Sequence, residues 1–125
     1  MQNQDNKLEV LIEHASLSLR KSEEEIRDKY KDFPICLMEY IENTKSERAI
    51  EVRFDNQDAT LSFSIENNIC TGSYAFFDSV NDEELLIDLL VESANYIFRK
   101  ASWKLPSCSV KVQETKDCTC FYFYQ

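Results

Sequence analysis

The sequence predicts a single α+β domain, residues 1–125, in which helices and an antiparallel sheet form two layers. Three observations predict this class. Apolar residues recur at helical spacing near the N-terminus, they alternate with polar residues from Arg48 onward, and a capped helical stretch separates this alternation from a second one near the C-terminus. The predicted order is N-terminal helices, a three-stranded antiparallel meander, a long helix over residues 81–100 and a C-terminal β-hairpin.

The N-terminal part predicts two helices. Ser22 and Glu25 have the spacing of a capping box at the start of the second helix, "SEEEIRDKY". Residues 33–43 are open to two interpretations. A third helix, with Asp32 as cap and Pro34 in its first turn, is favoured. A strand is the alternative, because apolar residues occur at both odd-numbered and even-numbered positions. The apolar face of the first helix consists of Leu8, Leu11, Ile12, Ala15 and Leu19.

The middle of the chain predicts the three strands of the meander. Apolar residues alternate with polar ones in two runs, around Val52 and around Phe63, and the turn "DNQD" separates the runs. The turn "ENN" follows, with asparagine in the role that glycine usually has, and "ICTGSYAFF" predicts the third strand.

The helix over residues 81–100 is predicted from its ends. Asn81 is the expected N-cap, Val80 and Leu85 are placed to form a hydrophobic staple, and Arg99 and Lys100 suit a helix C-terminus. The expected core face consists of Leu86, Leu89, Leu90, Ala94, Ile97 and Phe98.

The segment "CSVKVQETKDCTCFYFYQ" predicts a hairpin with its loop at Lys116-Asp117. This register places Gln113 opposite Cys120 and Lys111 opposite Tyr122, and it separates two faces. The core face consists of Val110, Val112, Phe121 and Phe123, and the outward face of Cys118, Cys120, Tyr122 and Tyr124 with Lys111. The outward tyrosines either contact a partner or are covered by the protein's own helices. If the last strand lies at the sheet edge, it also offers backbone groups for pairing.

Composition excludes several functions. The chain has 23 acids against 14 bases, a net charge of −9, which disfavours binding nucleic acid and suits a basic partner. Its single glycine, Gly72, excludes phosphate loops, dinucleotide-binding turns and nucleophile elbows, which need several glycines.

The start of the chain, "MQNQDNK", has no apolar stretch typical of a signal peptide, and no apolar run is long enough for a membrane span. Five cysteines, an odd number, then favour reduced thiols in a cytoplasmic protein.

Candidate catalytic and metal-binding residues have simpler explanations. Cys118 and Cys120 form one Cys-x-Cys pair, and the other three cysteines are scattered, so ordinary thiols are favoured over a zinc site. His14, the only histidine, is expected to be a solvated helix residue. The acid pairs fall at caps and turns. We therefore expect no catalytic residue, no metal and no cofactor.

The stretch "EVRFDNQDATLSFSIENNICTGSYAFFDSVNDEELLIDLLVESANYIFRK" resembles small acidic immunity proteins that neutralise bacterial polymorphic toxins. The shared layout is a hairpin-rich sheet followed by an acid-capped helix. The element order is also similar to the secretion-chaperone fold, in which "LLIDLLVESANYIF" corresponds to the second helix. Both resemblances imply a non-enzymatic protein that holds another protein, and neither assigns a functional residue by position.

The resulting hypothesis is a cytoplasmic binding protein that neutralises a toxin or effector by occlusion. Acids at turns and caps would steer a basic partner toward it, and the tyrosine face would anchor that partner. The candidate partner-binding residues are Tyr122, Tyr124, Cys118, Cys120, Lys111, Asp55, Asp58, Glu66 and Glu83. The alternatives are a homodimeric secretion-type chaperone, a small enzyme and a domain with no identifiable partner.

Overall fold

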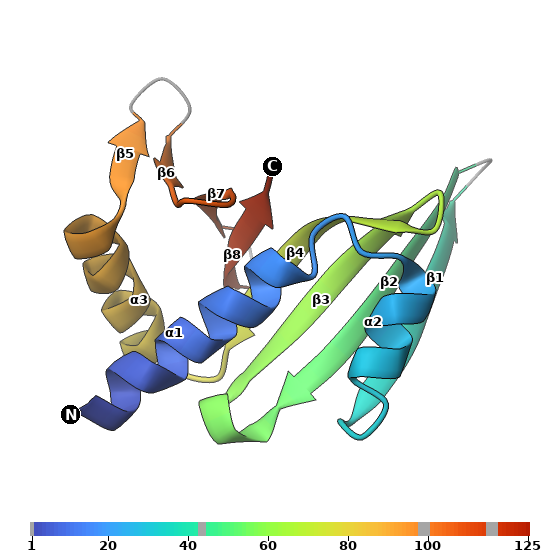
Figure 1. Cartoon of the computed structure of the whole chain (residues 1–125), viewed down its shortest axis with the longest axis horizontal. Coiled ribbons are helices and arrows are strands. Elements are labelled where there is room, and N and C mark those ends of the chain that lie inside the picture. Colours follow the sequence, from blue (N-terminus) through green and yellow to red (C-terminus); the bar gives the residue numbers. More distant parts are fainter. Residues whose placement is uncertain (1, 43–44, 98–100, 115–117) are drawn as a thin grey trace.

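The computed structural model describes residues 2–42, 45–97, 101–114 and 118–125. These residues form three α-helices and one antiparallel sheet of eight strands in the order β1-β2-β3-β4-β8-β7-β6-β5 (Figure 1). The α+β class is therefore confirmed. The helices are α1 (Gln2–Leu17), α2 (Glu23–Lys29) and α3 (Val80–Ser93); the strands are β1 (Ile35–Glu42), β2 (Lys45–Phe54), β3 (Ala59–Glu66), β4 (Ile69–Phe77), β5 (Asn95–Ile97), β6 (Ser102–Lys104), β7 (Ser109–Glu114) and β8 (Thr119–Tyr124), with a short 3₁₀ turn η1 (Asp55–Gln57).

The favoured helix over residues 33–43 is wrong, because this segment forms strand β1 at the sheet edge. All eight residues of β1 pair with β2, from Ile35 opposite Val52 to Glu42 opposite Lys45. Long-range pairing along the whole strand outweighs the local helix signal, and Pro34 precedes the strand. The meander therefore has four strands, one more than the sequence predicted.

The three predicted strands of the meander are present as β2, β3 and β4. Along β3 every second side chain is buried, and the intervening ones are half-buried or, for Glu66, exposed. Asn67 and Asn68 form the β3–β4 turn, with φ of 52° and 67°, as expected for asparagines replacing glycine in a two-residue hairpin. A register irregularity between Ser64 and Ile65 shifts the β3–β4 pairing by one residue.

Helix α3 is shorter than predicted and begins earlier. Its N-cap is Ser79, whose hydroxyl accepts a hydrogen bond from the Asp82 N–H at 3.2 Å, so the assignment of Asn81 is wrong. The predicted staple is not made by Val80, which is 67% exposed. The helix ends at Ser93 because Ala94 is extended and residues 95–97 pair with β6 as strand β5. The predicted end over residues 98–100 lies outside the described residues.

The predicted register of the C-terminal hairpin is confirmed. Lys111 lies opposite Tyr122, Gln113 opposite Cys120 and Val112 opposite Phe121. The predicted loop at Lys116-Asp117 lies outside the described residues. Strand β8 also pairs with β4, so the last strand is central in the sheet and is not an edge available for pairing.

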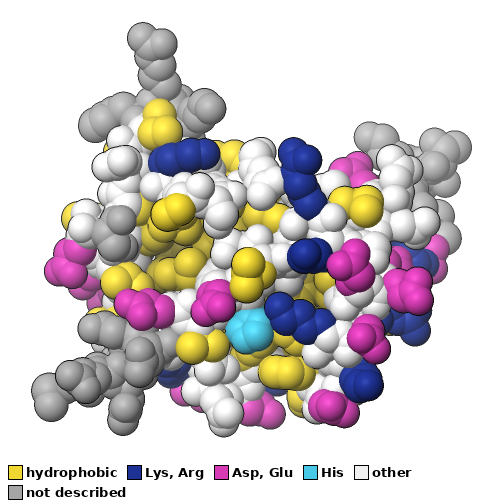
Figure 2. Space-filling view, in the orientation of Figure 1, with side chains coloured by type: hydrophobic (Ala, Val, Ile, Leu, Met, Phe, Trp, Pro, Cys, Tyr) yellow, Lys and Arg dark blue, Asp and Glu magenta, His cyan; other side chains and the backbone are white. Residues whose placement is uncertain are grey.

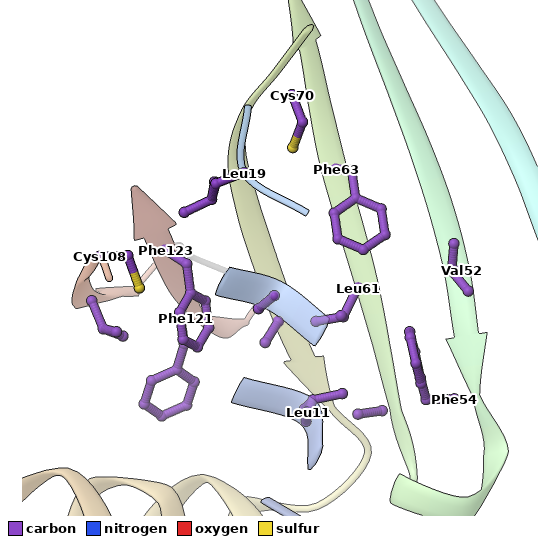
Figure 3. Close-up of a cluster of buried hydrophobic side chains, with 14 of the residues drawn as sticks. Leu11, Leu19, Val52, Phe54, Leu61, Phe63, Cys70, Cys108, Phe121 and Phe123 are labelled. Carbon is purple, nitrogen blue, oxygen red and sulfur yellow. The ribbon is translucent and has the colours of Figure 1, made fainter. Parts of the chain in front are cut away.

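One face of the sheet is covered by helices. Figure 1 shows α1 and α2 lying across this face, and α3 adds Leu86 and Leu90 to the same buried cluster. Figure 3 shows the cluster, in which Phe121 and Phe123 lie on the same side of the sheet as Leu11. The capping box of α2 is confirmed, with reciprocal hydrogen bonds between Ser22 and Glu25. No helix among the described residues is both long and apolar enough to cross a membrane.

The other side of the sheet is termed the open face. It carries the side chains that alternate with the buried ones, among them Ser62 and Ser64 of β3, Tyr74 of β4, and Tyr122 and Tyr124 of β8. These five side chains are half-buried, whereas their neighbours Phe63, Phe121 and Phe123 on the covered side are buried. The alternation predicted from sequence therefore separates a core face from an accessible face.

Candidate functional site

Three stacked tyrosines, termed the tyrosine row, dominate the open face. Tyr74 lies opposite Tyr122 on the neighbouring strand, and their ring centroids are 4.6 Å apart at an interplanar angle of 23°. The rings of Tyr122 and Tyr124 stack at 5.1 Å and 16°. The row comes from two strands that are far apart in sequence and are placed together by the β4–β8 pairing. Its half-buried rings present both apolar faces and hydroxyl groups.

Gly72 leaves room for the ring of Tyr122 because glycine has no side chain. A Cβ atom at this position would lie 2.5 Å from Cε1 of Tyr122 and 3.2 Å from its hydroxyl oxygen. The ring of Tyr122 therefore lies directly over the β4 backbone. The only glycine in the chain stands where an aromatic ring approaches the backbone closely, and its φ is not positive.

Lys111 occupies one end of the row. Its Nζ lies 5.7 Å from the ring centroid of Tyr122 and 5.5 Å from that of Tyr124, both within the range of a cation–π interaction. The predicted grouping of Lys111, Tyr122 and Tyr124 is therefore present in the structure.

A hollow of about 560 Å³, termed the groove, lies beside the row on the open face. Short side chains such as Ala49, Ser62 and Ser64 are among its lining residues, together with Tyr74 and Tyr122 of the row. Further lining residues are Met38, Glu47, Arg48, Ile65, Glu66, Thr71 and Phe76. None of these residues belongs to a helix, so the groove is a feature of the sheet alone.

The electrostatics of the groove are acidic. Arg48 is held by Glu23 of α2, at 2.9 Å, and by Glu39 of β1, at 3.4 Å. Among the described residues, Glu47 and Glu66 form no ion pair, and both are exposed. The groove therefore carries two carboxylates whose charge no described base neutralises.

The hydroxyls of Tyr74 and Tyr122 remain protonated at neutral pH. Burial raises the pKa of Tyr74, with further contributions from Tyr122, Cys120 and Glu47. Burial also raises the pKa of Tyr122, followed by the effects of Tyr124 and Glu66. The row can therefore offer hydroxyl donors as well as ring faces.

The remaining predicted site residues lie apart from this group. Asp55 pairs with Arg53 at 3.0 Å, and Asp58 pairs with Lys7 at 2.9 Å. Glu83 lies on α3 and is half-buried. Of the four predicted steering acids, only Glu66 lines the groove.

The two cysteines of the Cys-x-Cys pair differ in exposure. Cys118 is exposed, whereas Cys120 is buried, with 4% of its surface accessible. Cys120 therefore lies on the same face as Tyr122, as predicted from the register, but its side chain is buried and is not available on the surface. Among the described residues no group of three or more His, Cys, Asp or Glu side chains could hold a metal ion.

His14 is packed against aromatic rings and is not the solvated residue that the sequence predicted. Its Nδ1 lies 2.8 Å from the Tyr30 hydroxyl, and its ring centroid lies 4.9 Å from that of Phe54. Burial lowers the pKa of His14, and the nearby Lys29 lowers it further. These contacts give the histidine a structural role between α1, α2 and β2.

Sequence reasoning missed Tyr74, Gly72 and Glu47 as members of the site. Tyr74 stands in a predicted strand, but its proximity to Tyr122 depends on the strand order. The usable signal was Gly72, because a lone glycine inside a strand indicates a close approach by another group.

Two other surfaces expose hydrophobic groups. Figure 2 views the helix-covered face, where acidic and basic side chains are interspersed and hydrophobic atoms are exposed between α3 and the C-terminal strands. The edge strand β1 exposes Ile35, Leu37 and Met38, which are 37%, 48% and 47% accessible. The helix-covered surface therefore has mixed charge, and the β1 surface is an edge of the sheet.

Comparison with known proteins gave no match: no family model, curated protein or solved structure matches this chain.

Proposed function

We propose that this chain is a non-enzymatic binding protein that holds another protein on the open face of its sheet. In this proposal the helices form one layer and the sheet the other, so that binding leaves the helix-covered core untouched. The partner is a toxin or effector with a basic surface, and the chain neutralises it in the cytoplasm by occluding that surface.

The observation that carries the proposal is the tyrosine row on the accessible side of the sheet. Tyrosine combines a large contact area with few rotatable bonds, and it is enriched among the residues that dominate binding energy. Tyr74, Tyr122 and Tyr124 support one another by stacking and are thus ordered before a partner arrives.

The charge of the chain supports a basic partner. The net charge is −9, and the carboxylates of Glu47 and Glu66, which have no ion-pair partner among the described residues, lie beside the row. Such a charge steers a basic protein toward the acidic surface and raises the association rate, an effect that salt weakens.

The test uses the product of the reading frame adjacent to the gene, with calorimetry and a growth-rescue assay. Tyr124→Ala should weaken binding by about tenfold or more and abolish rescue, because it removes an anchor. The matched control is Tyr96→Ala, which removes an exposed tyrosine of β5 and should leave both readouts unchanged. If the adjacent product is not a partner, the same two variants are compared by cross-linking in the source cell. Equal capture by both variants contradicts the proposal.

The exposed edge strand β1 favours a second candidate, a homodimeric chaperone of the secretion type. Unpaired backbone groups flanked by Ile35, Leu37 and Met38 are suited to pairing with another strand. Light scattering separates the candidates, because a strict monomer at micromolar concentration rules out the homodimer.

A further inference from the structure

The position of Glu47 and Glu66 on the sheet suggests what occupies the groove. The last paired positions of β2 and β3 are Arg48 and Ile65, and Glu47 and Glu66 are the next residue on each strand. Both line the groove. Like charges that lie side by side on neighbouring strands destabilise a sheet. A cation bound between them would relieve this repulsion.

The tyrosine row shows how a cation binds to this face. At one end, the Lys111 ammonium lies over the rings of Tyr122 and Tyr124. At the other end, Tyr74 has no described lysine or arginine over its ring, although it lines the groove together with both glutamates. One end of the row is thus occupied by an internal cation, and the other end, where the described side chains supply no such cation, lies beside two carboxylates.

We propose that the groove binds an arginine side chain from the partner protein. The guanidinium lies on the ring of Tyr74 and donates hydrogen bonds to the carboxylates of Glu47 and Glu66. Its methylene groups contact Met38 on the opposite side of the groove. Arginine fits better than lysine because its planar head stacks on an aromatic ring and can serve two carboxylates at once. This inference rests on the proposed function, in which the open face holds a protein.

The test is a titration of the ¹⁵N-labelled protein, followed by NMR. The probes are the peptides acetyl-GRGRG-amide and acetyl-GKGKG-amide, which carry equal charge. The arginine peptide should give saturable shifts at Ser62, Ser64 and Tyr74, with a dissociation constant on the order of millimolar, and the lysine peptide should bind at least about threefold more weakly.

Variants distinguish binding in the groove from general electrostatic attraction to the acidic chain. The double variant Glu47→Gln/Glu66→Gln should weaken arginine-peptide binding by about tenfold. The charge-matched control Glu9→Gln/Glu92→Gln changes exposed helical acids and should weaken it by less than about twofold. Tyr74→Leu should remove the preference for arginine over lysine, because it removes the stacking surface.

Three results would overturn the inference. The first is the absence of saturable shifts at about 20 mM peptide. The second is equal weakening by the groove variant and its charge-matched control, which would indicate diffuse attraction. The third is a shift of the same amides with protein concentration in the absence of peptide, which would show a second copy in the groove. If the peptides fail while Tyr124→Ala still abolishes partner binding, the arginine inference fails and the proposed function stands.

Discussion

Gly72 and Tyr122 are in contact across the β4–β8 pairing, with the tyrosine ring lying over the glycine backbone. A Cβ atom at Gly72 would lie 2.5 Å from Cε1 of Tyr122, closer than any ordinary contact. The ring cannot move away freely, because it is stacked between Tyr74 and Tyr124. This one relationship connects the only glycine of the sequence to the geometry of the open face.

Replacing Gly72 with alanine should destabilise the protein and disturb the tyrosine row. The expected cost is about 1–3 kcal/mol from overpacking, offset by up to about 1 kcal/mol because alanine has less freedom in the unfolded chain. Urea unfolding measures the free energy, and near-ultraviolet circular dichroism reports the stacked rings. In the background of Tyr122→Ala the same change should cost clearly less. Equal costs in both backgrounds would contradict the assigned clash.

Lys7 links α1 to a buried acid and to an exposed one, and burial should decide which contact matters. Its Nζ lies 3.0 Å from Asp82, whose side chain is 7% accessible, and 2.9 Å from Asp58, whose side chain is 58% accessible. Lys7→Met should cost about 2–3 kcal/mol because it leaves the Asp82 carboxylate buried without its partner. Asp58→Asn should cost less than about 1 kcal/mol. Chemical denaturation of both variants checks this, and a larger loss for Asp58→Asn would refute it.

Stability should fall in mild acid because of His14. Burial, and then Lys29, lowers the pKa of His14 below its ordinary value of 6.5, while Glu13 acts weakly in the opposite direction. The unfolded chain therefore takes up this proton more readily than the folded one. The contribution of neutral His14 to the free energy of unfolding is complete above pH 6.5 and is lost as the pH falls toward the folded pKa.

The check is urea unfolding of the natural protein and His14→Gln between pH 5 and 8. Subtracting the two free energies of unfolding removes the pH-dependent contribution of the carboxylates, which both proteins share. The natural protein should gain stability relative to the variant between pH 5 and 7. A difference that stays constant with pH would show that His14 does not titrate differently in the folded state.

The parts of the fold that were predictable are those specified by local pattern. The C-terminal register followed from alternation, because Phe121 and Phe123 alternate with Cys120 and Tyr122 and only one parity can enter the core. Strand β1 was missed because its apolar residues occupy both parities. The end of α3 was missed because Ile97 continues the helical spacing, whereas its pairing with Ser102 is a tertiary contact.

The site was predictable only in its β8 half. Tyr122, Tyr124 and Lys111 belong to one hairpin, so their grouping follows from its register. Tyr74 lies 48 residues before Tyr122 in the sequence, and their stacking requires β4 and β8 to be neighbours in the sheet. No local pattern specifies this strand order, so one of the three tyrosines in the row and most of the groove could be found only in three dimensions.

Thiol reactivity should divide the five cysteines into two classes. Cys36 and Cys118 are exposed, and burial raises the pKa of Cys70, Cys108 and Cys120. Reaction with Ellman's reagent should therefore consume two thiols quickly in the native protein and the others only as the chain unfolds, since the thiolate is the reactive form. Cys118→Ser should reduce the fast class to one thiol, and Cys120→Ser should leave it at two. A fast class of three in the natural protein would contradict the burial of Cys120.

The N-terminus of α3 allows a direct test of the cap, because two candidate residues lie two positions apart. Ser79 accepts the hydrogen bond from the Asp82 N–H, while Asn81 lies inside the helix with an exposed side chain. Ser79→Ala should therefore cost about 1 kcal/mol, and Asn81→Ala should change the free energy of unfolding by no more than about 0.5 kcal/mol. Urea unfolding of both variants provides the measurement. If Asn81→Ala cost as much as Ser79→Ala, Asn81 would act as the N-cap, as the sequence pattern predicted. The position of Asp82 in the helix, and with it the ion pair between Lys7 and Asp82, would then need revision.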